Sequence, residues 1–274
     1  MKVGTAMKAR TLLIVAMSLI LTGALFVGAV NALGVTTAEA GKATLDNVRA
    51  YTPAIDEGSP SFAVDGGDLF VGAPGNWMSV KAPRNVIVNA VAIDPQREDV
   101  LYIGAANELA IYRSENAGQN WQRIPLTTDF VGGVTAIAVD GTQRLLYVGT
   151  DTAGLFRLRD VGSSVIVSGH LLLDEAIIDV VADSAGSGLA FARTAWSLYR
   201  AEDFGMRWVQ VNDFGSVATA VAIADTKPAT VYVGTTDRGL LRSRDGLTWT
   251  TANEGLGMAP GTRLRIDALA VDPL

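Results

Sequence analysis

Five short stretches rich in valine, isoleucine and alanine recur along the chain. They are apolar at nearly every position, which is typical of strands buried on both faces. They recur at intervals of roughly 40 to 50 residues, a spacing that indicates repeated units of several strands each. The five stretches span residues 88–94, 134–140, 177–183, 218–224 and 266–272.

Two more strands and a turn follow each of the first four stretches. A second apolar strand comes next, and a third strand ends in a hydrophobic pair and an arginine: Arg113, Arg157, Arg200 or Arg242. A turn and a fourth strand complete the repeat. Each repeat therefore predicts a four-stranded antiparallel sheet, and a ring of such sheets is a β-propeller.

The number of blades depends on how the two ends of the repeat region are paired. Residues 68–72 and 76–82 match the second and third strands of a repeat, whereas 266–272 match only a first strand. We expect the two ends to share one blade, which removes unpaired sheet edges and gives five blades. If residues 62–65 form a first strand themselves, the alternative is six blades. The sequence thus predicts an all-β propeller over residues 61–274.

The turns between the third and fourth strands share a pattern. An acidic or amide residue is followed two places later by glycine and, three beyond that, by a bulky residue, with the fourth copy one residue shorter. The side-chain oxygen can accept backbone N–H groups, the glycine can adopt positive φ, and the tryptophan can cover the turn. We interpret these turns as structural, with calcium binding as the alternative. The residues concerned are Ser114, Asn116, Gly118, Trp121, Asp160, Gly162, Asp203, Gly205, Trp208, Ser243, Asp245 and Trp249.

The turn pattern resembles the Asp-box, S-x-D-x-G-x-x-W, of BNR-type propellers in the sialidase, sortilin and photosystem II assembly-factor families. The resemblance covers residues 61–274 and implies a turn on the hairpin between the third and fourth strands. The copies depart from it: Asn116 replaces aspartate, the second copy lacks serine and tryptophan, and the fourth lacks one residue. A turn needs only its geometry, so this erosion favours a structural role.

The amino-terminal segment is predicted to anchor the chain in a membrane. Residues 12–33 are almost wholly apolar, a length that suits a transmembrane helix over 11–33 better than the shorter core of a signal peptide. Basic residues place 1–10 in the cytoplasm, and 34–60 form a linker. Small-x-small motifs at 30–32 and 38–40 leave cleavage as the alternative. A helix-packing face is formed by Ala24, Gly28 and Ala32.

Composition limits the chemistry. The chain of 274 residues has no cysteine and one histidine, His170, which excludes disulfides, cysteine-ligated metals and sites with several histidines. We therefore expect no cofactor and no metal. The net charge is −6 although residues 1–40 are net basic, so the propeller is acidic and nucleic acid is not an expected partner.

Neither catalysis nor sugar binding is favoured by the recurrent polar residues. The arginines that end the third strands occupy equivalent positions around the ring, so they do not converge on one substrate carboxylate as sialidase chemistry requires. Asp94, Asp140, Asp183 and Asp272 end the first strands, where they are explained as turn residues. Tyr102, Tyr147 and Tyr232 lie between apolar neighbours, which favours core packing over a repeated glycan site.

The remaining hypothesis is a non-enzymatic scaffold. We expect a single-pass protein of the bacterial inner membrane whose propeller lies in the periplasm and binds other subunits of a membrane complex. The assembly-factor resemblance suggests an electron-transport complex, respiratory or photosynthetic. A secreted carbohydrate-binding propeller or a sialidase-like glycoside hydrolase is the alternative. The loops 129–133, 213–216 and 253–265 are candidate contact surfaces.

Overall fold

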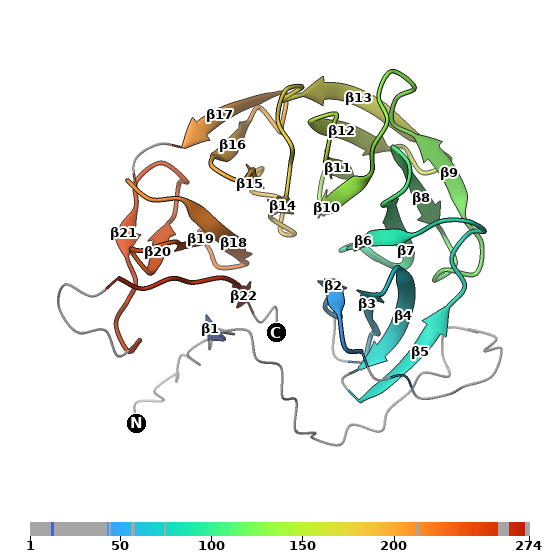
Figure 1. Ribbon diagram of the computed structural model, residues 1–274, viewed down its shortest axis with the longest axis horizontal. Coiled ribbons are helices and arrows are strands. Elements are labelled where there is room, and N and C mark those ends of the chain that lie inside the picture. The colour runs from blue at the N-terminus through green and yellow to red at the C-terminus, as the bar shows by residue number, and fades with distance from the viewer. Residues whose placement is uncertain are drawn as a thin grey trace, which may run out of the picture.

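The chain folds into five four-stranded antiparallel sheets arranged as the blades of a propeller (Figure 1). The computed structural model describes residues 12–13, 43, 45–55, 58–73, 75–211, 214–256 and 263–271, and every element in these ranges is a strand. The prediction of an all-β propeller with five blades is confirmed. Within each blade the strands follow chain order from the centre of the ring outward.

The strands of the five blades have the following bounds. Blade 1 contains β2 (Val48–Thr52), β3 (Ser61–Asp65), β4 (Asp68–Ala73) and β5 (Asn76–Val80). Blade 2 contains β6 (Val88–Asp94), β7 (Arg97–Ala105), β8 (Ala110–Ser114) and β9 (Gln122–Pro125). Blade 3 contains β10 (Val134–Asp140), β11 (Leu145–Thr150), β12 (Leu155–Asp160) and β13 (Val165–Leu171). Blade 4 contains β14 (Asp179–Ala182), β15 (Ala190–Arg193), β16 (Leu198–Glu202) and β17 (Arg207–Val211), and blade 5 contains β18 (Ala218–Ala224), β19 (Thr230–Thr235), β20 (Leu240–Ser243) and β21 (Thr250–Thr251).

The first blade is built differently from the expectation. Its innermost strand is β2, which lies within residues 34–60 that the sequence suggested were linker. The segments expected as second and third strands, 68–72 and 76–82, instead give the third and fourth strands, β4 and β5, because β3 supplies the second. The expected sharing of one blade by the two ends of the chain is therefore wrong.

The carboxyl-terminal stretch occupies the place of a further innermost strand beside blade 5. The Ile266 N–H donates to Thr235 O at 3.0 Å, as the Ile177 N–H donates to Thr150 O at 2.9 Å at the joint between blades 3 and 4. The Cβ site of Gly234 meets Ile266, as that of Gly149 meets Ile177, so glycine permits the same close approach. The stretch ends in β22 (Ala270–Val271), which pairs with β1 (Leu12–Leu13) and not with β3.

The hydrophobic core lies between the blades. Four clusters of buried side chains each join two successive blades, such as Tyr102 and Ile111 of blade 2 with Val148 and Phe156 of blade 3. A strand buried between two sheets must be apolar on both faces, which explains the valine-rich stretches of the sequence. The blades are thus fastened to their neighbours in chain order.

The ring has two distinct ends, because the strands of each blade alternate in direction. The connections between blades and the loops between second and third strands lie at one end, here called the linker end. The turns that follow the first and third strands lie at the other, here called the turn end. Contacts such as Thr152 Oγ1 to Val131 O, at 2.8 Å, join a loop to a connection at the linker end.

The predicted membrane anchor falls mostly outside the described residues. Of residues 11–33 the structure describes Leu12–Leu13 alone, as strand β1. Among the described residues, none belongs to a helix with the length and apolar character needed to cross a membrane. The anchor and its packing face at Ala24, Gly28 and Ala32 remain predictions.

Candidate functional site

The repeated turns are held by hydrogen bonds to their own backbone. Ser114 Oγ accepts the Gly118 N–H at 2.8 Å and donates to Asn116 Oδ1 at 3.0 Å, and Asn116 Oδ1 also accepts the Asn120 N–H at 2.9 Å. Positive φ angles of 86°, 92°, 76° and 71° occur at Gly118, Gly162, Gly205 and Gly246. These are properties of a rigid hairpin turn.

The fourth turn shows the same bonding with an aspartate. Asp245 Oδ1 accepts the N–H groups of Leu247 and Thr248 and the hydroxyl of Ser243, each at 2.8 Å. These bonds, those from the Thr248 and Leu247 backbone first, hold the pKa of the Asp245 carboxyl well below its usual range. The Oδ1 atom of this carboxylate is therefore engaged by its own turn.

The tryptophans of the turns contact the preceding blade. The Trp208 ring lies 5.4 Å from the Tyr147 ring of blade 3 in an edge-to-face arrangement, and Trp249 lies 6.4 Å from Phe191 of blade 4. Trp121 donates from Nε1 to Lys81 O, just past blade 1, at 3.1 Å. Each tryptophan thus fastens its turn to the blade before it.

The recurrent arginines of the third strands also join successive blades, each by a hydrogen bond to the turn of the following blade. Arg157 Nε donates to Phe204 O and Arg200 Nε donates to Asp245 O, both at 2.8 Å and both in the turn of the next blade. Arg113 Nη2 likewise donates to Gly162 O at 2.8 Å. Each arginine lies opposite an aromatic residue of its blade's second strand, and we call the pair a seat: Tyr102–Arg113, Tyr147–Arg157 and Phe191–Arg200.

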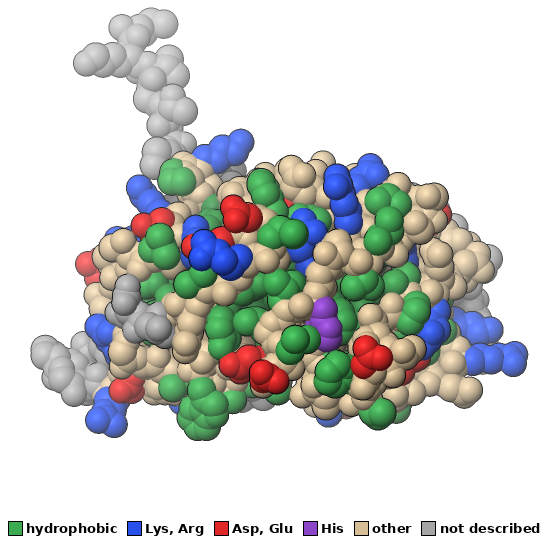
Figure 2. Space-filling model, turned by 90° about the horizontal axis from the view of Figure 1, so that it is seen from above, with side chains coloured by type: hydrophobic (Ala, Val, Ile, Leu, Met, Phe, Trp, Pro, Cys, Tyr) green, Lys and Arg blue, Asp and Glu red, His purple; other side chains and the backbone are tan. Residues whose placement is uncertain are grey.

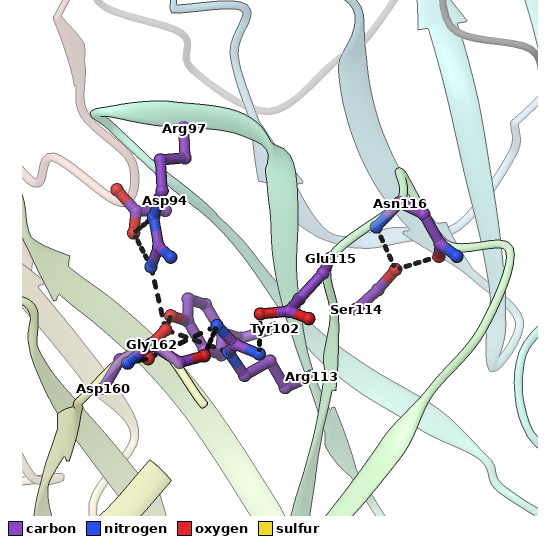
Figure 3. A network of polar contacts seen from close by, with 9 residues as sticks. All are labelled: Asp94, Arg97, Tyr102, Arg113, Ser114, Glu115, Asn116, Asp160 and Gly162. Carbon is purple, nitrogen blue, oxygen red and sulfur yellow. Dashed lines mark hydrogen bonds and ion pairs between the residues drawn. The ribbon is translucent and has the colours of Figure 1, made fainter. Parts of the chain in front are cut away.

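The seat between blades 2 and 3 is part of a larger cluster of polar contacts (Figure 3). Asp160 Oδ2 accepts the Tyr102 hydroxyl at 2.5 Å, Arg97 Nη2 at 2.8 Å and Arg113 Nε at 2.9 Å. Arg97 also pairs with Asp94 at 2.6 Å. Burial alone would raise the pKa of Asp160, but the hydrogen bonds from Tyr102, the Gly162 N–H and the two arginines outweigh it, so the pKa is lowered.

The aspartates that end the innermost strands are turn residues. Asp94 Oδ1 accepts the Gln96 N–H at 2.9 Å, Asp140 Oδ1 accepts the Thr142 N–H at 3.0 Å, and Asp183 Oδ2 accepts the Ser187 N–H at 2.9 Å. All three are about 1% exposed. Asp272, the fourth expected residue, lies outside the described ranges. These buried carboxylates accept hydrogen bonds from their own turns. Glycoside hydrolysis requires a pair of carboxylates that face one cleft, and these three side chains do not form such a pair.

The single histidine is also structural. His170 Nε2 donates to Ala153 O at 2.6 Å, and the ring stacks on Phe156 with centroids 4.0 Å apart. Phe130 meets the same ring edge-to-face at 5.9 Å. Figure 2 looks onto this outer edge of the ring and shows the histidine among hydrophobic side chains.

A pocket opens at the linker end where the innermost strands of blades 1 to 4 meet. It encloses about 380 Å³ and is lined by Arg49, Asn89, Thr135, Asp151, Ala176, Ile177 and Ile178. The Asp151 carboxylate is engaged by the Gly133 N–H at 2.8 Å, whereas no hydrogen bond or ion pair joins the exposed Arg49 guanidinium to any described residue. The pocket therefore offers one available cation beside apolar walls.

Exposed apolar side chains lie at the same end of the ring as this pocket. Val131 is 94% exposed, and Trp196, which lines a separate pocket between blades 4 and 5, is 80% exposed. Further apolar residues at the same end are Val48, Ile87, Phe130, Leu173 and Ile178. Two of them lie in or beside loop 129–133, one of the predicted contact surfaces; Asp213 of loop 213–216 and residues 257–262 of loop 253–265 lie outside the described ranges.

A charged pair inside blade 4 was missed by sequence reasoning. Asp179 and Arg193 lie opposite each other in β14 and β15. Burial raises the pKa of the Asp179 carboxyl and lowers the pKa of the Arg193 guanidinium, whose Nε has no hydrogen-bond partner among the described residues. The signal was present, because the other innermost strands carry alanine at this position, as in Ala90 and Ala136.

Comparisons with known proteins support the fold. No protein family matches the chain by sequence, and no curated protein matches it. Among solved structures it is similar to a glycoside hydrolase family 74 xyloglucanase from Xanthomonas campestris, with a TM-score of 0.59 and 21% identity over 82% of this chain and 40% of that one. It is also similar to the family 74 enzyme of Niastella koreensis, with a TM-score of 0.57 and 16% identity over 74% of this chain and 38% of that one.

A third similar structure is a protein with a bound peptide, described as YCF48 bound to D1 peptide. The TM-score is 0.55 and the identity 13%, over 75% of this chain and 68% of that one. This chain spans about two fifths of the length of the glycoside hydrolases it resembles. At these identities the likeness establishes a shared propeller fold.

Proposed function

We propose that this chain is a non-catalytic scaffold subunit that binds a polypeptide at the linker end of its propeller. The observation that carries the proposal is the exposure of Val131 and Trp196 at the same end of the ring as a pocket lined by Ile178 and Arg49. The Arg49 guanidinium is available there to an incoming carbonyl or carboxylate. Exposed apolar groups beside a concave polar site are typical of protein interaction surfaces.

The placement of the acidic residues supports a role without hydrolysis. The recurrent aspartates and the box-type turns use their oxygens within the fold, and the YCF48 propeller shows that a related ring can hold a peptide. We further propose a membrane anchor at residues 11–33, a periplasmic propeller and a partner within a bacterial electron-transport complex. These last points rest on the apolar amino-terminal segment and on the resemblance of the repeated turns.

The test is native purification of two matched variants. Val131→Asp places a charge at the linker end, and Val161→Asp, at a side chain 47% exposed on the turn end, is the control. After extraction in mild detergent, affinity isolation and mass spectrometry, we expect the wild type and Val161→Asp to retain the same membrane subunits in fixed proportion. We expect Val131→Asp to lose them, because a carboxylate must be desolvated in an apolar contact.

The same samples test the anchor and the competing function. Recovery of peptides from residues 1–40 in the complex is the expected result. A free chain beginning near residue 33 or 41, without partners, would contradict the scaffold. Release of reducing sugar from xyloglucan or another β-glucan by the purified chain would favour the glycoside hydrolase instead, the function that the family 74 likeness supports.

A further inference from the structure

The fifth blade carries a fourth seat, which holds no turn within the described residues. Tyr232 and Arg242 lie opposite each other in β19 and β20, as the pairs of the filled seats do. The aromatic residues of the filled seats, Tyr102, Tyr147 and Phe191, are all 0% exposed, whereas Tyr232 is only half-buried. Arg242 is exposed, and no hydrogen bond or ion pair joins its guanidinium to another described residue.

A pocket of about 410 Å³ marks the position that a turn fills elsewhere in the ring. It is lined by Thr230, Tyr232, Arg242, Ser243, Arg244, Asp245, Thr248 and Thr250, all from blade 5. The equivalent surface of blade 3, around Tyr147, is covered by Gly205 and Trp208 of blade 4. The pocket is therefore an interface of the kind seen between the other blades, and no described residue of a following blade covers it.

The chain supplies the first strand of a sixth position but, among the described residues, not its turn. Thr219 Oγ1 donates to Ile266 O, as Thr135 Oγ1 donates to Ile177 O at the joint between blades 3 and 4. Residues 264–271 therefore hold the place of an innermost strand. The second, third and fourth strands that follow it in the other blades have no described counterpart here.

We propose that the fifth-blade seat is a docking site for a β-hairpin turn of another polypeptide. The contacts in the filled seats indicate which groups this turn must carry. The turn presents a backbone carbonyl to the arginine Nε, as Phe204 O and Asp245 O do at 2.8 Å. It carries glycine where it crosses the aromatic ring, because a Cβ on Gly205 or Gly246 would lie 2.2 Å from Tyr147 or 2.6 Å from Phe191.

The charge of the seat adds a preference. Two positive side chains, Arg242 and Arg244, line the pocket against one negative side chain, Asp245. The field is therefore positive, which favours a turn with acidic residues beside its glycine. A charge-assisted bond from arginine to a carbonyl is also stronger than a neutral one.

A second copy of this chain fits the seat poorly. The blade that a second copy would bring forward is blade 1, which includes its own innermost strand β2. That strand would require the space that residues 264–271 already occupy beside β18. A separate hairpin, without an innermost strand, meets no such conflict.

The test measures binding of a defined hairpin to the full chain. The probe is a cyclised peptide with the sequence of residues 198–211, whose turn sits in the Tyr147–Arg157 seat in this fold. Isothermal titration should show one peptide per chain. Arg242→Ala should weaken binding about tenfold, the effect of losing one charge-assisted hydrogen bond. Arg159→Ala, which removes an exposed arginine on β12, is the matched control and should bind as the wild type does.

The peptide has its own control. The same hairpin with Gly205→Ala should fail to bind, because its methyl group would overlap the Tyr232 ring as it would overlap Tyr147. The proposal is overturned by no binding at millimolar peptide, by binding that Arg242→Ala leaves unchanged, or by equal binding of the Gly205→Ala hairpin. Concentration-dependent self-association that Arg242→Ala abolishes would identify a second copy as the occupant and overturn the assignment to another polypeptide.

Discussion

Asp160 and Asp245 hold the same place in their turns but have different surroundings. The Asp245 carboxylate accepts hydrogen bonds only from its own turn, at the surface, whereas the Asp160 carboxylate accepts hydrogen bonds from Tyr102, Arg97 and Arg113 of the preceding blade. The second turn has lost the serine and tryptophan of the pattern. The buried ion pairs to Asp160 stand in for the missing contacts and fasten blade 3 to blade 2.

Replacing this carboxylate should destabilise the fold in a pH-dependent manner. Asp160→Asn removes the buried carboxylate that Arg97 and Arg113 contact, leaving Arg113 only Glu115 and Gly162 O, and should lower the free energy of unfolding by about 3 kcal/mol at pH 7. Because the folded-state pKa of Asp160 is lowered, its contribution is fully present above the ordinary carboxyl pKa of about 4 and is lost as the pH falls through the folded-state value. Urea denaturation at pH 7 and pH 3 should show a large difference from wild type that shrinks at acid pH.

The control for this prediction is Asp129→Asn, at an exposed loop position. It should change the free energy of unfolding by less than about 0.5 kcal/mol at either pH. A loss from Asp160→Asn that is constant between pH 7 and pH 3 would contradict a lowered pKa as its origin.

Two turn glycines separate backbone strain from close packing. Gly162 and Gly205 have φ angles of 92° and 76°. A Cβ on Gly162 would be 3.9 Å from its nearest neighbour, whereas one on Gly205 would overlap Tyr147. Gly162→Ala should therefore cost about 1 kcal/mol, for backbone strain alone. Gly205→Ala should cost about 2 kcal/mol more, the penalty of overpacking, as measured by thermal unfolding. Equal losses of stability in the two variants would show that the Tyr147 ring moves aside for the added methyl group.

At the scale of elements, the turn between the third and fourth strands connects each blade to the preceding one. Trp208 and Trp196 lie in the same blade but differ in their surroundings. Trp208 packs on Tyr147 of the preceding blade, whereas Trp196 is 80% exposed. Trp208→Ala should lower the free energy of unfolding by about 3 kcal/mol. Trp196→Ala should leave it nearly unchanged. Denaturant titrations of the two variants measure this, and similar losses would mean that Trp196 packs on the fold.

The elements could be predicted where burial dictates the side chains. Strands such as β6 and β10 are flanked by sheets on both sides, so almost every position is apolar and the pattern is plain. β2 was missed because its residues, VRAYT, are largely exposed or half-buried and carry an arginine, which resembles linker. The sharing of one blade by both chain ends was wrong for the same reason, since β2 supplies the strand that 266–272 was expected to give.

The candidate site was predictable only in part. The turn residues and the recurrent arginines stand out because they repeat, and the structure brings each arginine to the turn of the next blade. Arg49 and Trp196 could not be identified in this way, because neither belongs to the repeated pattern. Arg49 lies in β2, the strand that the sequence did not predict, and Trp196 lies in a loop whose path depends on the finished ring. Asp179 and Arg193 break the repeat, which is the pattern to search for when repeats are otherwise structural.

At the scale of the whole molecule, stability should decrease toward blade 5. β12 and β13 pair over six register positions and are covered by the next blade, whereas β20 and β21 pair over two and border the open seat. Native-state hydrogen exchange should show β20 amides exchanging at least about tenfold faster than β12 amides, because local opening costs less there. Uniform protection across the ring would show that it unfolds as one unit.

The arginine seats also bear on how such a chain can change in evolution. Each joint connects an arginine to a turn 45 to 49 positions further along, so the coupled residues belong to two successive blades. The unit that keeps these contacts together is therefore not one blade. It begins with the seat of one blade and ends with the turn of the next. After gain or loss of a segment of one repeat length, each arginine that is followed by another repeat again faces a turn. Rings of this kind can thus change size by whole repeats without a new contact having to arise.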